Sequence, residues 1–289
     1  MAQGQKSPAM RGAVIGLVGT ILTVCGGLTG AGISAAAKIY QIERETQQVN
    51  LAPSASEQAL SIDTGTIFIS RQQAAALDPE SYFVDLDLGL VIRRPLPGWD
   101  EPERLTVGEV LAEEGAATPS PPLSEQPVYR IRYGEPVVMQ SDRHMLVNGL
   151  PLTREWLDIL VRLYGPEPWT ISYYSQVTIN VFDRSVVEEL GINDLPDLLL
   201  TLVSFSGSRV NRLIAEDESN FMVVQSSVTY EDVKVAGESE TVIKEAWFLV
   251  AETEDAYYTV EITYLPLSGQ SVQVWEDLQA YMDSFRVIR

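Results

Sequence analysis

The sequence predicts an α+β protein: an N-terminal transmembrane helix followed by an antiparallel sheet flanked by helices. Residues 12–37 form a run of 26 residues without charge. Several later segments alternate apolar and polar residues with the period of a strand, and others have the spacing of amphipathic helices. The chain has one Cys, so an internal disulfide is excluded. A domain of about 240 residues buries enough core without one.

The uncharged run at residues 12–37 predicts a membrane span. A helix rises about 1.5 Å per residue, and a bilayer core of about 30 Å needs roughly 20 apolar residues. Lys6 and Arg11 precede the run without a nearby acid, whereas acids lie beside the basic residues that follow it. This bias predicts a single-pass protein of the cell membrane, with residues 1–11 cytoplasmic and the C-terminal domain extracytoplasmic.

Glycines give the predicted helix a narrow surface at two places. Gly12 with Gly16, and Gly26 with Gly30, have the small-xxx-small spacing that lets membrane helices approach closely. These four residues are the candidates for packing against another membrane helix. In a segment this rich in glycine, chance also produces such spacings.

Two processing alternatives to a retained helix stay open. Cys25 follows a basic start and an apolar stretch, as the lipid-modified Cys of a bacterial lipoprotein does. Val24 is large for that motif, which has a small residue just before the Cys, and the apolar run continues past Cys25. The three alanines at residues 35–37 have the small side chains of a signal-peptidase site. The plain alternative for Cys25 is a small apolar residue in a helix.

Charge divides the chain into two parts. The net charge is −20, and residues 1–50 hold four basic and two acidic side chains, so residues 51–289 carry −22. A surface of this kind repels nucleic acid and anionic lipid. It suits a cationic partner, a weakly bound divalent cation, or solubility alone.

The exported acidic domain is predicted to follow a stem. Residues 38–65 form this stem or linker, and residues 66–289 hold the periodic segments. Residues 113–127 are rich in Pro, Ala, Ser and Thr, which predicts a loop inside the domain.

The first long periodic segment of the domain is residues 82–93. Apolar side chains alternate along it, which predicts one strand with Asp85 and Asp87 on its solvent face. A turn follows at residues 95–99, in which Trp99 is an aromatic plug.

The rest of the domain mixes strands and helices. Thr153 can cap a helix that Gly165 and Pro166 end, and another predicted helix is interrupted near Gly191 and Pro196. Short turns separate the last three long strands, which predicts an antiparallel meander. The predicted strands are residues 66–69, 128–138, 169–182, 221–235, 241–252, 257–265 and 286–289. The interrupted helix covers residues 184–205, and the last predicted helix covers residues 271–285.

Two stretches carry a family resemblance. Residues 88–99 run from Leu-Gly-Leu-Val-Ile through Pro to Gly-Trp, and residues 247–288 contain Trp-Phe-Leu-Val, a strand, a helix with Trp275 and a terminal Ser-Phe-Arg-Val-Ile. They resemble the PsbP-like family. The resemblance covers about residues 80–289 and implies an α/β/α sandwich and a non-enzymatic role in docking on or assembling a larger complex. Residues 113–165 carry no part of it, and it assigns no functional residue. The predicted transmembrane helix departs from the soluble photosystem protein of that family.

Residue types that catalysis and metal binding need are scarce. His144 is the only His, and its neighbours form no motif for activating a nucleophile. One His and one Cys do not make a zinc site. Asp85 and Asp87 have the spacing that opens a calcium loop without its later ligands, and they are the weak metal candidates. The acidic groups at residues 216–218 and 252–255 are expected in solvated turns, and the five Trp residues mostly occupy positions patterned as core.

The leading hypothesis is a membrane-anchored, non-enzymatic accessory or assembly subunit of a membrane protein complex. Its partners are other membrane protein subunits, without nucleic acid and without a cofactor. The first alternative is a cell-surface binding module for a cation or small solute. The second is a hydrolase that uses paired carboxylates, whose separation is a three-dimensional quantity. The sequence leaves the partner and the oligomeric state open.

Overall fold

A computed structural model describes residues 67–113, 119–192, 194–205, 208–217, 220–265 and 272–289. In these residues the protein is a mixed α+β fold with large sheets and few helices, as the sequence predicts. The elements are β1 (Phe68–Ile69), α3 (Arg71–Ala75), β2 (Tyr82–Asp85), β3 (Leu90–Arg93), β4 (Glu103–Thr106), α4 (Val107–Glu113), η2 (Leu123–Glu125), β5 (Pro127–Ser141), β6 (Leu146–Val147), β7 (Leu150–Pro151), α5 (Arg154–Tyr164), β8 (Trp169–Asp183), α6 (Arg184–Glu189), α7 (Leu195–Phe205), β9 (Arg209–Asp217), β10 (Phe221–Val235), β11 (Glu238–Glu252), β12 (Ala256–Tyr264), α8 (Val272–Ser284) and β13 (Arg286–Ile288).

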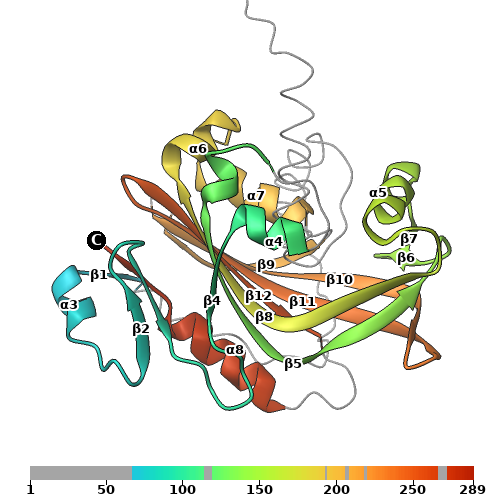
Figure 1. Cartoon of the computed structure of the whole chain (residues 1–289), viewed down its shortest axis with the longest axis horizontal. Helices are drawn as coiled ribbons and strands as arrows, with labels where there is room; N and C mark the ends of the chain where they lie inside the picture. The colour runs from blue at the N-terminus through green and yellow to red at the C-terminus, as the bar shows by residue number, and fades with distance from the viewer. Residues whose placement is uncertain (1–66, 114–118, 193, 206–207, 218–219, 266–271) are drawn as a thin grey trace, which may run out of the picture.

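The larger sheet dominates the described part of the chain. Its strand order is β4-β5-β8-β12-β11-β10-β6-β7, and β9 also pairs with β10. The three consecutive strands β10, β11 and β12 form the predicted antiparallel meander. Strand β8 joins the meander antiparallel to β12, and β5 pairs antiparallel with β8. Figure 1 shows these long strands side by side across the molecule.

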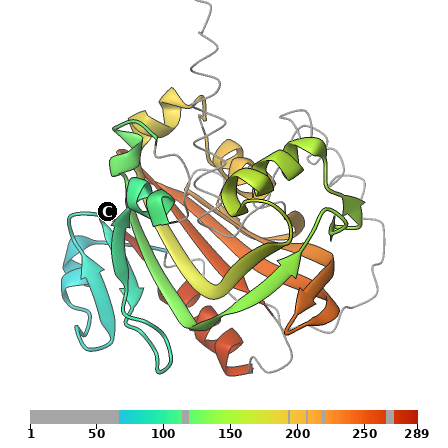
Figure 2. The same cartoon turned by 45° about the vertical axis from the view of Figure 1, so that its right-hand side comes forward.

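The larger sheet closes on itself at one end. The outer edge of β10 pairs in turn with β9, with β6 and with β5. The last of these pairings joins Val235 to Met139 and Lys234 to Gln140, so β5 and β10 meet from opposite ends of the run β5-β8-β12-β11-β10. The pairing of β5 with β8 shifts between Tyr133 and Val137, and irregularities of this kind let a strand bend. Figure 2 shows β5 and β8 bent together at this end.

Both faces of the central strands are buried. On β11, Phe248 belongs to a core cluster under α4, α6 and α7, whereas Trp247 and Leu249 belong to a cluster under α8 and the smaller sheet. Strands covered on both faces have nearly continuous apolar sequences. A third cluster lies at the closed end of the sheet, where it includes Leu160 of α5 and Trp169 of β8.

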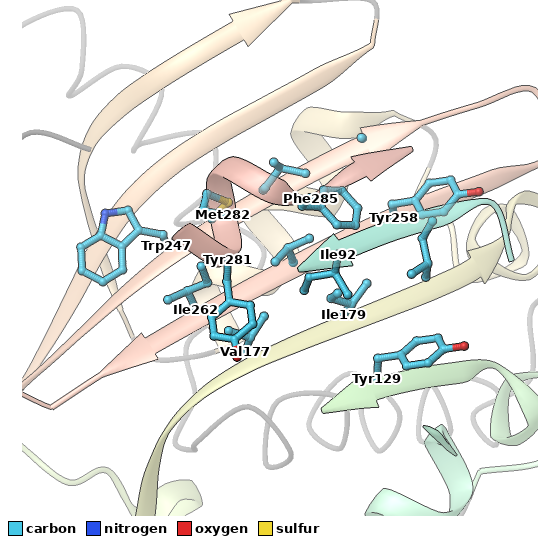
Figure 3. Close-up of a cluster of buried hydrophobic side chains, with 14 of the residues drawn as sticks. Ile92, Tyr129, Val177, Ile179, Trp247, Tyr258, Ile262, Tyr281, Met282 and Phe285 are labelled. Atoms are coloured by element: carbon cyan, nitrogen blue, oxygen red, sulfur yellow. The ribbon is translucent and has the colours of Figure 1, made fainter. Parts of the chain in front are cut away.

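The smaller sheet brings the two ends of the described chain together. Its strand order is β1-β13-β3-β2, with β13 parallel to β1 and antiparallel to β3. The C-terminus therefore lies beside β1 (Figure 1). Helix α8 precedes β13, and its residues Tyr281 and Met282, with Phe285 directly after it, lie against side chains of β8 and β12 (Figure 3).

Residues 82–93 form a hairpin, so the prediction of one strand there is wrong. Strand β2 ends at Asp85 and β3 begins at Leu90. Leu86 and Leu88 continue the apolar alternation through the turn, although Leu86 is 42% exposed. Gly89 has a φ of 68°, a left-handed conformation that glycine adopts without strain.

The other predicted elements are confirmed in outline. The predicted break near Gly191 separates α6 from α7, and residues 286–289 contribute β13. Trp99 is the expected plug, because its indole is buried, contacts Tyr281, and donates a hydrogen bond of 2.8 Å to Asp277. Seven described elements had no prediction: α3, β4, α4, η2, β6, β7 and β9.

The predicted transmembrane segment falls outside the description. In residues 67–289, as far as they are described, no helix has the length and apolar composition that crossing a bilayer requires. Residues 12–37, with Gly12, Gly16, Cys25, Gly26 and Gly30, lie outside the described residues.

The turn at Gly89 generates a stability prediction. A Cβ at Gly89 would lie 2.7 Å from the Tyr258 hydroxyl, which donates a hydrogen bond to the Leu88 carbonyl. We expect Gly89→Ala to lower the unfolding free energy by roughly 2–4 kcal/mol, from the left-handed φ and from overpacking together. Urea unfolding followed by Trp fluorescence measures the loss.

Gly237→Ala is the matched control for this substitution. Gly237 has a φ of 90°, and a Cβ there meets nothing within 4 Å, so only the backbone cost of about 1–2 kcal/mol is expected. Adding Tyr258→Phe to Gly89→Ala should recover the steric part. Equal losses of unfolding free energy for Gly89→Ala and Gly237→Ala would contradict the close approach of the Tyr258 hydroxyl to Gly89.

Candidate functional site

The two metal candidates, Asp85 and Asp87, lie at the β2–β3 turn. Asp85 is buried, and its Oδ1 accepts hydrogen bonds from the backbone amides of Asp87 and Leu88 at 3.0 and 2.9 Å. Its Oδ2 accepts a short hydrogen bond from the Tyr129 hydroxyl and forms an ion pair with Arg104 at 3.4 Å. The prediction that Asp85 faces solvent is therefore wrong. Among the described residues, no group of three potential ligands could hold a metal ion.

Hydrogen bonds keep Asp85 ionised despite its burial. Burial is the largest single influence and raises the pKa of Asp85, but the Tyr129 hydroxyl, the Leu88 amide, the charge of Arg104 and the Asp87 amide together lower the pKa below its ordinary value. Burial and the neighbouring carboxylate raise the pKa of Tyr129. In this pair Asp85 is therefore a charged acceptor and Tyr129 a neutral donor, and the role of the pair is structural.

The other residues singled out in the sequence have structural surroundings. His144 is exposed, and its backbone amide donates to Asp142. Glu252 pairs with Arg184 at 2.9 Å, whereas Glu218 lies outside the described residues. Trp99, Trp169 and Trp247 are buried, and Trp275 packs its ring on Trp247.

Sequence reasoning missed a group of buried polar residues on the α4–α7 face of the large sheet. Cross-strand pairing places Arg130 beside Thr178 and Thr178 beside Glu261 in one row. The next row pairs Arg132 with Gln176 and Gln176 with Thr263. All of them are buried except Arg132, which is half-buried. We call these six residues the polar rows.

The strand sequence explains why the polar rows were missed. Arg130 and Arg132 alternate with the apolar residues Tyr129, Ile131 and Tyr133, the pattern of a strand with one face in water. Burial of the second face comes from α4 and its neighbours, and α4 was not predicted.

Arg130 links three elements through its guanidinium. It is 1% exposed, and its Nε and Nη2 donate to Glu103 of β4 at 3.0 and 2.8 Å. Its Nη2 also donates to Glu113 of α4 at 2.7 Å. Burial is the largest influence and lowers the pKa of Arg130, but the bonds and charges of the two carboxylates together raise it above its ordinary value. Arg130 therefore stays charged and holds α4 on the sheet.

The buried atoms without a hydrogen-bond partner in the described structure include three donors of the polar rows: Nη1 of Arg130, Nε of Arg132 and Oγ1 of Thr178. Glu261, whose carboxylate accepts from Thr263 at 3.2 Å, lies beside Thr178 in the same row. Buried polar groups in native proteins almost always have a partner, either protein or ordered water. By contrast, the neighbouring Asn180 donates to Thr259 at 2.8 Å. The three donors therefore lie beside the carboxylate of Glu261 on this face, an arrangement that buried water commonly bridges.

Comparison with known proteins finds no matching family model, curated protein or solved structure. The PsbP-like resemblance therefore depends on the two stretches at residues 88–99 and 247–288 alone and stays a prediction.

Asp85 generates a prediction about pH. A carboxyl whose pKa is lowered on folding stabilises the protein above its unfolded pKa, near 3.8, and this contribution is lost as pH falls through the folded pKa. We expect the difference in unfolding free energy between the wild type and Asp85→Asn to be largest near neutral pH and to shrink below about pH 4. Urea unfolding from pH 7 to pH 3 measures it.

Asp87→Asn controls for the loss of one charge in the same turn. Among the described contacts, Asp87 bonds Asp85 through its backbone amide only, so its substitution should cost little near neutral pH. A pH-independent difference for Asp85→Asn would contradict the ionised pair.

The Arg130 cluster generates a prediction about coupling. Glu103→Gln or Glu113→Gln alone leaves one carboxylate on Arg130, and each should cost about 1 kcal/mol of unfolding free energy. The double substitution leaves a buried cation without a carboxylate, and we expect a loss of about 3–5 kcal/mol. Chemical denaturation of the four proteins checks this, and strictly additive losses would show that the carboxylates act independently.

Proposed function

We propose that this chain is a single-pass, membrane-anchored, non-enzymatic accessory or assembly subunit of a membrane protein complex, with its acidic domain extracytoplasmic. The observation that carries the proposal is the uncharged run of 26 residues at 12–37, followed by a domain with a net charge of −22. A run of this length suits a bilayer of about 30 Å. The domain completes its own core, so a partner would meet its surface.

Exposed apolar side chains support a docking role for one end of the domain. Adjoining apolar side chains on a protein surface mark interaction sites, whereas single ones are ordinary. Five of the seven large apolar residues that are exposed in the described chain flank the cluster at the closed end of the sheet. They are Val138 of β5, Leu150 of β7, Val161 and Tyr164 of α5, and Ile243 of β11. Figure 1 shows α5, β6 and β7 together at this end.

The helices on both sides of the large sheet support an α/β/α sandwich of the PsbP-like kind. That resemblance implies docking on a larger complex and so agrees with the proposal.

Co-purification from the native membrane in mild detergent tests the subunit proposal. We expect defined membrane proteins in fixed stoichiometry with the full-length chain. A form lacking residues 1–45 separates the two contact regions: loss of the partners places the contact in the membrane segment, and retention places it on the acidic domain. A chain that purifies alone in both forms would overturn the proposal.

Substitutions at the closed end locate the contact on the domain. Leu150→Ser with Val161→Ser should reduce partner recovery by roughly tenfold, which corresponds to about 1.4 kcal/mol of lost contact. Leu86→Ser is the control, since Leu86 is also an exposed apolar residue, at 42%, but lies in the β2–β3 turn of the other sheet. Equal partner recovery with the double substitution and with Leu86→Ser would show that the apolar end is not part of the interface.

A further inference from the structure

Strand β9 is a long edge strand of the large sheet. Its 9 residues, Arg209–Asp217, pair with β10 alone among the described strands. The other strands at a sheet border in the described structure, β1, β2, β4 and β7, have two to four residues. An edge strand presents unpaired N–H and C=O groups, and proteins usually keep such strands short. The outer edge of β9 is therefore a backbone template for one further strand.

An exposed leucine lies at the middle of this edge strand. Leu213 is the central residue of β9, and it is 43% exposed. Of the large apolar residues that are exposed in the described chain, only Leu213 and Leu86 lie away from the closed end of the sheet. A partner that covers β9 would therefore need an apolar residue opposite the centre of the strand.

The charges along β9 change sign from one end to the other. Its sequence has arginines at positions 209 and 212 and acids at positions 216 and 217, so it is balanced, whereas residues 51–289 carry −22. An antiparallel copy centred on Leu213 sets position 209 opposite position 217 at both ends of the pair. Opposite charges that face each other across an antiparallel pair are stabilising. The strand is therefore complementary to its own copy.

The edge of β9 is also irregular. Its pairing with β10 shifts at two places, and bulges add local twist to a strand. Twist of this kind opposes the addition of long, flat strands to an edge. An identical copy has the same two irregularities, so the two edges have the same twist.

We propose that β9 pairs antiparallel with β9 of a second copy of this chain, in a two-fold dimer centred on Leu213. Each chain has one such edge, so a two-fold pair uses both edges and closes as a dimer. The acidic remainder of the domain repels a second copy, which restricts contact to a surface whose charges balance. The pairing depends on the fold of the domain and goes beyond the subunit role.

A cysteine at the two-fold position tests the register in the full-length protein in an uncharged detergent. Directly opposite residues of an antiparallel pair have Cα atoms about 4.5–5.5 Å apart, within the range that a disulfide spans. In a Cys25→Ser background, we expect Leu213→Cys to give a disulfide-linked dimer under mild oxidation, detected on a non-reducing gel. Asn211→Cys should stay monomeric on the gel, because the two copies of position 211 lie roughly 13 Å apart in this register.

Substitution of Leu213 tests whether this edge holds the dimer together. Leu213→Asp sets two like charges opposite each other, which is destabilising on paired strands. It should raise the dissociation constant of the dimer by about tenfold or more, measured by sedimentation in the same detergent. Leu86→Asp is the matched control, since Leu86 is 42% exposed and lies in a turn of the other sheet. It should leave the dissociation constant unchanged.

Three results would overturn the proposal. The first is a protein that stays monomeric at every concentration that sedimentation reaches. The second is a dimer of equal stability in the wild type and in Leu213→Asp, which would place self-association elsewhere, such as the glycine-rich segment. The third is equal cross-linking of Asn211→Cys and Leu213→Cys, which would contradict the register. Recovery of membrane subunits is a separate readout, so failure here is distinguishable from failure of the subunit proposal.

Discussion

Burial of both faces of the long central strands is the constraint on which the rest of the structure depends. Strands β8, β10, β11 and β12 direct alternate side chains into two cores, so each face of the sheet needs its own covering layer. Helices α4, α6 and α7 form one layer, and α8 with the smaller sheet forms the other. The second layer is complete only when β13 pairs between β1 and β3. Both ends of the described domain are therefore needed for one core.

The same constraint explains why polar residues inside the sheet occur in bonded sets. A strand without a solvent face has no position where a polar side chain meets bulk water, so its partner must come from the protein or from a bound group. Asn180 and Thr259 satisfy each other across two strands. Arg130 instead receives carboxylates from β4 and α4, and both carboxylates stay 48% exposed. This partial exposure lowers the desolvation cost of placing the charges of Arg130, Glu103 and Glu113 together. The chain also has more acidic than basic side chains.

Local signals predicted much of this fold. The long strands and the last helix follow from periodicity, and the helix break near Gly191 follows from its composition. Leu86 and Leu88 misled the strand prediction because a turn between two short strands preserved the alternation. The same alternation assigned Asp85 to the solvent face. Its partners Tyr129 and Arg104 are distant in sequence, so the local pattern does not reveal them. Only tertiary contacts show that such a carboxylate organises a turn.

The polar rows could not be predicted, because their character depends on what covers them. Arg130 and Arg132 alternate with apolar residues as they would on a strand with one face in water, and the covering layer converts that pattern into buried donors.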